Sequence, residues 1–325
     1  MFGKGLWIIS SGREEVPDSY DANTENGYTS TPTTYTISSV ADADAFCERF
    51  QRKYGYKDSE ATLHIGDKVQ INDGTYNVDW YVAGFDVEYN KTASDGTVYN
   101  NGYGIALVPV TQLDTPILIA LRGYANTYYY YSQQTSLSGF AAYSSDSIYA
   151  YSKLHYTPVL KSVLGNHLVP RTVLVSNAVS SLNASRYNRT RYECTSSYTW
   201  VNDFCVTLLS LYQILGTNQT LNPLGFGSIS GSKASSQYNI ITQYDIGEAN
   251  YKLPLFDNIS CYDNINYAIR GFRLRDYDDR YEEDDVLYGY IALLNSASSY
   301  TWKQRPSSQS RSESIGPFRP MIYIR

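Results

Sequence analysis

Few residues of this 325-residue chain have types and spacing suited to catalysis or metal binding. Its three histidines lie far apart, and none belongs to a pair with metal-ligand spacing. The four cysteines are widely spaced without a CxxC pair, which predicts ordinary semi-buried thiols rather than a zinc site or a disulfide scaffold. The sequence has no GxSxG nucleophile elbow and no Walker A motif. We therefore expect no catalytic residue, no cofactor and no enzymatic activity.

The densest group of oxygen ligands is an acidic and aromatic run, DYDDRYEEDD, at residues 276–285. Its carboxylates could bind Ca²⁺, which takes several oxygen ligands. The run lacks the glycine of an EF-hand loop, however, and Arg280 and two tyrosines interrupt it. A solvated loop or a loop that contacts a partner is favoured, so no metal site is predicted, with Ca²⁺ binding as the alternative.

Tyrosine dominates the aromatic residues, with 34 Tyr against 10 Phe and 4 Trp. Its side chain combines a large rigid contact area with a hydrogen-bonding hydroxyl, which is typical of recognition surfaces. Residues 273–312 combine Tyr, Trp and Arg, the types enriched at binding hot spots. The candidate ligand-binding residues are Arg273, Arg275, Tyr277, Asp278, Arg280, Tyr281, Tyr288, Tyr290, Tyr300, Trp302 and Arg305. The alternative is that these aromatic side chains pack at strand edges and in subunit contacts.

Charge and hydropathy argue against several other classes. The formal net charge is −6 without a basic cluster, so no nucleic-acid partner is expected. No apolar run approaches the roughly 18 residues that span a bilayer, so membrane insertion is not expected. The apolar patch within residues 1–11 is too short for the core of a secretory signal.

The sequence predicts both helices and strands as the elements that position these residues. A polar stretch at residues 12–38 predicts an extended arm or loop. Apolar residues at helical spacing predict helices over residues 39–55 (with Ser39 as N-cap), 147–155, 157–165 (with Thr157 as N-cap) and 200–215. Strands are predicted over residues 63–71 and 76–87, joined by an Asp-Gly turn, and over residues 104–110, 172–179, 267–273, 287–295 and 319–324.

An ordered series of short runs carries a resemblance. The runs include IGDKVQINDGT at 65–75, WYVAGFD at 80–86, LGNHLV at 164–169, YDIGEANYKLP at 244–254 and FRPMIYI at 318–324. Together they resemble a family of gut-bacteriophage and prophage virion proteins. The last run resembles the closing Arg-Pro strand of C-type-lectin-like proteins. Formylglycine-generating-enzyme-like domains and the variable proteins of diversity-generating retroelements share that fold.

The resemblance implies an α+β protein with a C-type-lectin-like fold, in which a twisted, mostly antiparallel sheet follows an N-terminal arm. Residues 1–56 would form the arm and a helix for attachment or oligomerisation, and residues 57–325 the lectin-like domain. The variable segment would be 267–316. The chain departs from the family at Ala268, where an aromatic residue is usual, and at its GPFRP ending, residues 316–320.

The function implied is that of a phage virion protein, made in the bacterial host cytoplasm and exposed on the particle. Its Tyr-rich face would bind a host cell-surface protein or glycan. Other virion proteins and further copies of the chain are the expected partners, with a trimer favoured. The Glu-Pro-Asn, Gln-Pro-Asp and Trp-Asn-Asp signatures of Ca²⁺-dependent sugar binding are absent. The alternative is a purely structural capsid decoration, head-fibre or tail component without a receptor-binding role.

Overall fold

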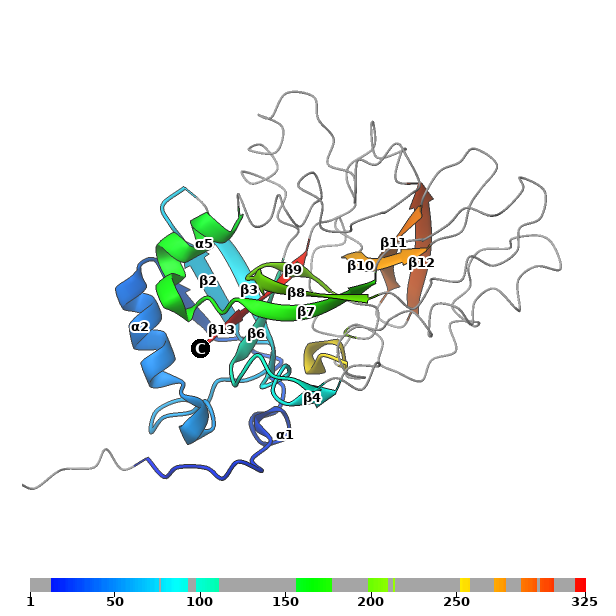
Figure 1. Ribbon diagram of the computed structural model, residues 1–325. Helices are drawn as coiled ribbons and strands as arrows, with labels where there is room; N and C mark the ends of the chain where they lie inside the picture. The colour runs from blue at the N-terminus through cyan, green and yellow to red at the C-terminus, as the bar shows by residue number, and fades with distance from the viewer. Residues whose placement is uncertain are drawn as a thin grey trace, which may run out of the picture.

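A computed structural model describes residues 13–75, 77–92, 98–110, 156–176, 198–209, 213, 252–257, 272–278, 288–296, 299–306 and 319–325. These residues form a mixed α+β structure in which antiparallel strand pairs predominate (Figure 1). The predicted α+β class with a mostly antiparallel sheet is therefore confirmed at this level. The helix predicted over 147–155 lies outside the described residues.

The largest sheet within the described residues, here called the central sheet, is open and has six strands. In sheet order they are β1 (Thr34–Ile37), β2 (Lys68–Asn72), β3 (Asn77–Phe85), β6 (Ile105–Pro109), β13 (Pro320–Ile324) and β9 (Thr207–Leu208). β1 and β2 run parallel, whereas the other neighbouring pairs run antiparallel. The predicted strand at 104–110 is confirmed as β6.

Helices pack around this sheet. α2 (Val40–Arg49) packs against β1, and α5 (Thr157–Leu164) packs against α2 and β2. α1 (Ala22–Asn26) and the 3₁₀ helix η5 (Pro254–Asp257) pack against β3. The shorter elements are the 3₁₀ helices η1 (Arg52–Tyr54) and η3 (Gly165–His167) and the small hairpin of β4 (Lys91–Thr92) and β5 (Val98–Tyr99).

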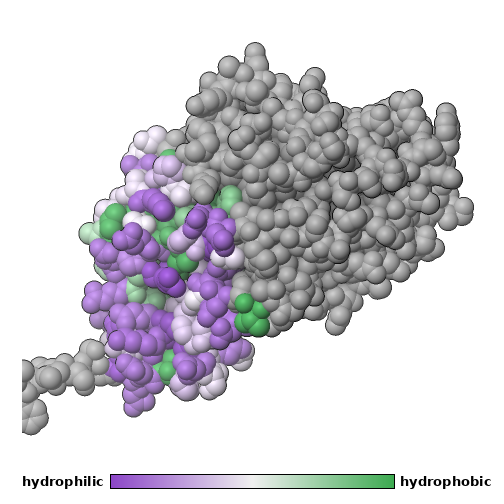
Figure 2. Space-filling model, viewed as in Figure 1, coloured by the Kyte–Doolittle hydropathy of each residue, from purple (hydrophilic) through white to green (hydrophobic). Residues whose placement is uncertain are grey.

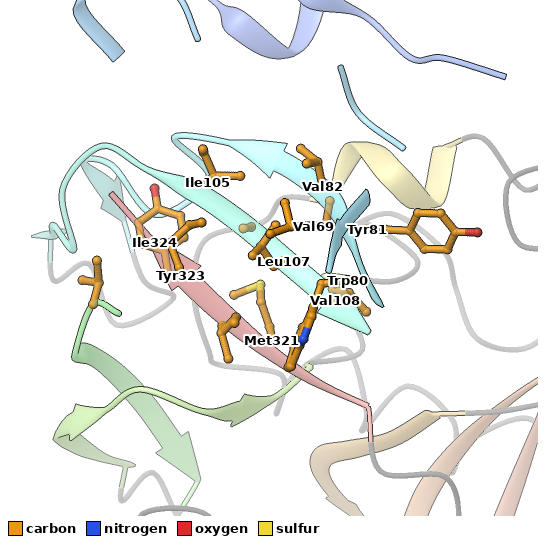
Figure 3. Close-up of a cluster of buried hydrophobic side chains, with 14 of the residues drawn as sticks. Val69, Trp80, Tyr81, Val82, Ile105, Leu107, Val108, Met321, Tyr323 and Ile324 are labelled. Carbon is orange, nitrogen blue, oxygen red and sulfur yellow. The ribbon is translucent and has the colours of Figure 1, made fainter. Parts of the chain in front are cut away.

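The C-terminal strand β13 lies inside the central sheet, between β6 and β9. All four residues from Met321 to Ile324 are completely buried. Because alternate side chains of a strand face opposite sides, this burial means that both faces of the sheet are covered. Figure 3 shows side chains of β3, β6 and β13 packed in one cluster, with Tyr81 pointing away from it. Each large apolar side chain buried here contributes about 1.5–3 kcal/mol.

The hairpin of β2 and β3 forms at the predicted Asp-Gly turn. The antiparallel register closes with Asn72 opposite Asn77. Gly74 has a φ of 89°, which glycine adopts without strain, and its N–H donates to Asn72 Oδ1 at 2.8 Å. The local turn signal therefore sets the register that aligns Trp80 with Val69.

Helix α2 begins as predicted but ends earlier. The Ser39 side chain caps it by accepting the Asp42 N–H at 3.2 Å, and Asp42 Oδ2 accepts the Ser38 N–H at 2.9 Å. The helix stops at Arg49, and Gly55 instead closes η1, donating its N–H to Arg52 O at 2.8 Å. The ring centroids of Phe46 and Phe50 lie 5.1 Å apart, and both rings are edge-on to Tyr35.

Helix α5 confirms the prediction over 157–165 with a shift of one residue. Tyr156, not Thr157, occupies the N-cap position, so Pro158 lies in the second helical position, where its missing N–H costs no hydrogen bond. Gly165 forms the C-cap with a φ of 57°. A Cβ at Gly165 would lie only 3.0 Å from the Val40 side chain, so glycine also permits the close packing of α5 against α2.

The prediction of a helix over 200–215 is wrong at residues 200–209 and confirmed at Gln213, which is helical. Residues Tyr198–Phe204 form β8, which pairs antiparallel with β7 (Arg171–Ser176), and Thr207–Leu208 form β9. The four consecutive residues from Phe204 to Thr207 are all buried. A surface helix needs a polar face that this run does not have, and pairing with β7 and β13 satisfies its backbone instead. The predicted strand at 172–179 is confirmed as β7 through Ser176.

The arm or loop predicted over 12–38 also differs from the structure, because α1 and β1 both lie within it. Asp21 caps α1 by accepting the Asn23 N–H at 3.0 Å, and Asn23 in turn donates to Phe85 O at 2.8 Å. Ala22 and Ile37 belong to the same hydrophobic cluster as the central sheet. Side chains before and after residue 56 therefore share one core.

A separate antiparallel sheet, here called the three-stranded sheet, consists of β10 (Phe272–Asp278), β11 (Tyr288–Ser296) and β12 (Ser299–Pro306). The strands predicted at 287–295 and 319–324 are confirmed as β11 and β13. The strand predicted at 267–273 is confirmed at Phe272 and Arg273, whereas residues 267–271 lie outside the described residues. β10 continues into the acidic run as far as Asp278, and β12 was not predicted. The bounds of β10 and β12 are set by their pairing with β11, because β11 is the hydrogen-bonding partner of both strands.

The described surface is mainly hydrophilic on the face shown in Figure 2, where apolar residues form small separate spots. Among the residues whose side chains the structure describes, the exposed large apolar ones are Val40 and Val98. In the same part of the chain, no helix has the length and apolar character needed to cross a membrane.

Candidate binding face and the residues that position it

The three-stranded sheet gathers most of the predicted binding residues. Nine of the eleven candidates fall on its strands. They are Arg273, Arg275, Tyr277 and Asp278 on β10, Tyr288 and Tyr290 on β11, and Tyr300, Trp302 and Arg305 on β12. Arg280 and Tyr281 lie outside the described residues. Residues up to 32 positions apart in the sequence therefore meet in one small sheet.

The register places candidate positions in rows across the sheet. Tyr277 lies opposite Gly289, which lies opposite Arg305. In the next row, Asp278 lies opposite Tyr288. Directly opposite residues in an antiparallel pair are close neighbours, with Cβ atoms about 4.5–5.5 Å apart. Because successive rows face opposite sides of a sheet, the Tyr277 and Arg305 positions lie on one side and the Asp278 and Tyr288 positions on the other, where β10 ends and β11 begins.

The remaining candidates follow the β11–β12 ladder toward its other end. Tyr290 lies opposite Gln304, Trp302 opposite Ala292, and Tyr300 opposite Leu294. Each aromatic position is matched with a residue that is not aromatic, so the aromatic positions are distributed along the ladder rather than stacked in pairs. The ladder shifts between Leu294 and Ser296, near the turn into β12.

The three-stranded sheet meets the rest of the described structure through β10, which packs beside β9 and β7. Figure 1 shows β10 near the end of β7. β9 pairs with β13, with Met321 opposite Thr207 and Pro320 opposite Leu208. The placement of the candidate face therefore depends on how β7, β9 and β13 are fixed to one another.

A buried polar group, here called the Arg171 cluster, lies where these strands meet. It contains Arg171, Glu88, Asn101, Thr207 and the backbone oxygen of Met321. Arg171 Nη1 donates to Glu88 Oε1 at 2.6 Å, and both side chains are completely buried. Arg171 Nη2 donates to Met321 O at 3.0 Å and to Thr207 Oγ1. Asn101 Nδ2 donates to Glu88 Oε2 at 3.0 Å.

The Arg171 cluster was missed in the sequence. Arg171 precedes the apolar run TVLV, and Glu88 follows the apolar strand β3 after only a short turn. A charge next to an apolar strand is common at a strand end, so each residue alone predicts only a solvated terminus. Their pairing across 83 positions of sequence is what identifies them.

Arg319 stands where the resemblance places the start of the closing strand, and it is also buried, with 1% of its surface exposed. Pro320 follows as the first residue of β13, a position where a missing N–H is tolerated. Both residues of this Arg-Pro pair are therefore buried at the start of β13.

A second polar group, here called the Arg52 cluster, contains Arg52, Asp86, Tyr56 and Tyr103. Arg52 Nε lies 2.7 Å from Asp86 Oδ2, and its guanidinium lies 4.6 Å from the Tyr103 ring centre. Tyr56 Oη donates to Asp86 Oδ1. Burial raises the pKa of Asp86, against the effect of these hydrogen bonds, and also raises the pKa of Tyr56 well above its ordinary value.

The Arg52 cluster holds loops rather than strands. Arg52 Nη2 donates to the backbone oxygens of Asp18 and Tyr20, at 3.2 and 3.0 Å. Tyr56 and Asp86 both have positive φ angles, 58° and 54°, which is uncommon for residues other than glycine. The cluster thus fixes residues 17–20 against the turn that follows β3.

Two histidines and one cysteine have surroundings that show how they are held. His64 Nδ1 hydrogen-bonds to Asn26 O, and His167 contacts Asp44 Oδ1 at 2.7 Å and Arg325 O at 2.5 Å. Burial, followed by the nearby Asp44 carboxylate, raises the pKa of the Cys47 thiol to about 12. No group of three or more His, Cys, Asp or Glu side chains suited to a metal ion occurs among the described residues. His155 lies outside them.

Comparisons of the chain with protein-family models, with curated proteins and with solved structures found no match.

Proposed function

We propose that this chain is a phage virion structural protein whose three-stranded sheet displays a Tyr-rich face for adhesion to a host cell-surface protein or glycan. The observation that carries the proposal is the gathering of nine of the eleven candidate residues on β10, β11 and β12. Tyrosine and arginine supply rigid contact area and charged hydrogen bonds, the combination that dominates binding hot spots.

The separation between core and candidate face supports the proposal. The central sheet carries the large apolar core, whereas the three-stranded sheet packs beside it through β10. A rigid core that carries a peripheral set of polar and aromatic residues is the usual arrangement of binding proteins, because the residues at the surface can change without loss of the fold. Aromatic substitutions on β11 and β12 would therefore alter binding more than folding.

The proposed fold is C-type-lectin-like. Its support is the closing strand β13, which follows Arg319-Pro320 and lies antiparallel between β6 and β9. Weak single-site binding would be strengthened on a particle that carries many copies, since linked sites raise the effective concentration of the ligand. A homotrimer as the unit of display belongs to the same proposal.

Adsorption to cells tests the proposal. The purified chain is labelled and incubated with whole cells of a panel of gut bacterial strains. Replacement of Tyr277, Tyr281, Tyr288 and Tyr290 by Ala together is expected to lower the amount bound at least about tenfold. The same four residues changed to Phe form the matched control, which keeps the ring area and removes only the hydroxyl groups.

Folding is checked in both variants by circular dichroism and thermal unfolding. If the alanine variant folds and adsorbs as well as the wild-type chain, this face does not bind the cells. If the wild-type chain binds no strain of the panel but is found in purified particles, the purely structural role is favoured instead.

A further inference from the structure

We infer that Arg171 is a positioning residue that holds the three-stranded sheet on the central sheet. The inference concerns how β10 is held in place, and it stands independently of what the three strands bind.

Arg171 lies at the start of a strand that packs beside β10. Arg171 is the first residue of β7, and Thr207 is the first residue of β9. These are the two strands beside which β10 packs. The Arg171 guanidinium bonds to Thr207 and to Met321 O of β13, so one side chain ties both neighbours of β10 to β13 of the central sheet.

The Arg171 guanidinium donates hydrogen bonds to three acceptors. Its planar fork presents N–H groups in fixed directions, so three acceptors are satisfied together in only one relative arrangement. Here the acceptors come from the turn after β3, from β9 and from β13. A shift of any one of these segments would break a hydrogen bond in the dry interior.

A second set of bonds fixes β7 itself. Asn101 Nδ2 donates to Thr172 O at 3.0 Å, and the Thr172 N–H donates to Asn101 Oδ1 at 2.8 Å. Asn101 is also held by Glu88, to which it donates from both its side chain and its backbone, each at 3.0 Å. The strand that carries Arg171 is therefore held in the same frame as the carboxylate that Arg171 binds.

The energetics of burial favour positioning over net stabilisation. Removing both ions of a pair from water costs about as much as their attraction and hydrogen bonds return, and apolar replacements of such pairs are often neutral or stabilising. An apolar cluster of the same volume would also fill the space between β7, β9 and β13. It would not fix their relative placement, because apolar contacts have no required direction.

A double variant that removes both charges tests the inference. In Arg171→Met with Glu88→Gln, no uncompensated charge is left, and the glutamine oxygen still accepts from Asn101. The variant is expected to fold, with β2, β3 and β6 protected as in the wild-type chain. Amide hydrogen exchange is expected to become about tenfold faster in 272–278, 288–296 and 299–306, measured relative to those three strands.

Arg171→Lys is the second variant, because lysine keeps the charge for Glu88 but lacks the fork that reaches Thr207 and Met321 together. Exchange in the three-stranded sheet is expected to become faster in this variant too. If the double variant does not fold, Arg171→Lys alone tests the inference. Arg52→Lys is the matched control, expected to increase exchange at residues 17–20 and to leave the three-stranded sheet unchanged.

Two results would overturn the inference. One is unchanged protection of the three-stranded sheet in the folded variants of Arg171. The other is an equal increase in exchange throughout both sheets, which would mean that Arg171 only contributes to global stability.

Discussion

Arg171 and Arg52 each bind a carboxylate and several further oxygens, yet they do so in different surroundings. The side chains of Arg171 and Glu88 have no exposed surface, whereas those of Arg52 and Asp86 are 12% and 15% exposed. Arg171 connects strands β7, β9 and β13, whereas Arg52 connects loop segments at residues 17–20 and the turn after β3. Ion pairs of the same chemistry therefore hold strands together in one place and loops in the other.

The difference shows what burial does to an ion pair. In the dry interior, removal of one partner leaves the other charge without water or a counter-charge. Replacing one residue of a buried pair is therefore strongly destabilising. Near the surface, water replaces part of what is lost. A third ion pair is more exposed than these two. Arg49 binds Asp58 at 2.7 Å, and the Arg49 side chain is 36% exposed. The cost of breaking each pair is expected to fall with exposure.

Glu88→Ala is expected to have the largest effect of the series. It leaves the Arg171 charge buried without its partner, which costs about 3–5 kcal/mol of the free energy of unfolding. Denaturant-induced unfolding followed by circular dichroism measures the change. Glu48→Ala, on the exposed side of α2, is the control and should change stability by no more than about 0.5 kcal/mol. A loss below about 1 kcal/mol in Glu88→Ala would break the comparison.

Arg52→Met is expected to cost less, about 1–3 kcal/mol at neutral pH. Asp86 keeps its hydrogen bonds from Tyr56 and from the Gly104 N–H, and solvent reaches the site. The same denaturant titration gives the value. A loss equal to that of Glu88→Ala would show that exposure does not govern these pairs.

The dependence of stability on pH is expected to have opposite signs at Asp86 and Asp58. Burial raises the pKa of Asp86, so its contribution to stability is full below the unfolded pKa and is lost as pH rises through the folded value. Burial also opposes ionisation of Asp58, but hydrogen bonds from the N–H groups of Glu60 and Ala61 and from Arg49 lower its pKa overall. Its contribution is therefore present above the unfolded pKa and is lost on acidification.

Unfolding of Asp86→Asn and Asp58→Asn between about pH 3 and pH 7 measures these contributions. Relative to the wild-type chain, Asp86→Asn should lose less stability as pH rises, and Asp58→Asn should lose less as pH falls. Changes of the same sign in both variants would contradict the assignment.

Arg49→Met is expected to have the smallest effect, about 0–1 kcal/mol. Its charge is solvated, and Asp58 keeps two backbone hydrogen bonds. The effect should shrink further in high salt, because screening weakens exposed pairs. Unfolding at low and high ionic strength measures it, and a loss that is insensitive to salt would argue for packing rather than charge.

The residue types of the candidate site could be predicted from the sequence, but its strand bounds could not. The residue types around 273–305 indicate a recognition surface, but β12 was not predicted, nor was the continuation of β10 from Arg273 to Asp278. Both strands depend on register with β11, and neither has alternating apolar residues strong enough to mark its ends. The Arg171 cluster could not be predicted either, because its members are spread over more than 230 positions of sequence and meet only in the fold.

Features with local causes follow from the order of the amino acids alone. Asn72-Asp73-Gly74 turns the chain between β2 and β3, Ser39 starts α2 and Gly165 ends α5, because each acts on backbone groups within a few residues. The tertiary structure alone decided that 198–208 would be strands rather than a helix, since β7 and β13 supply their partners. It also decided that Arg171 would meet Glu88, since only packing brings distant charges into one water-free space.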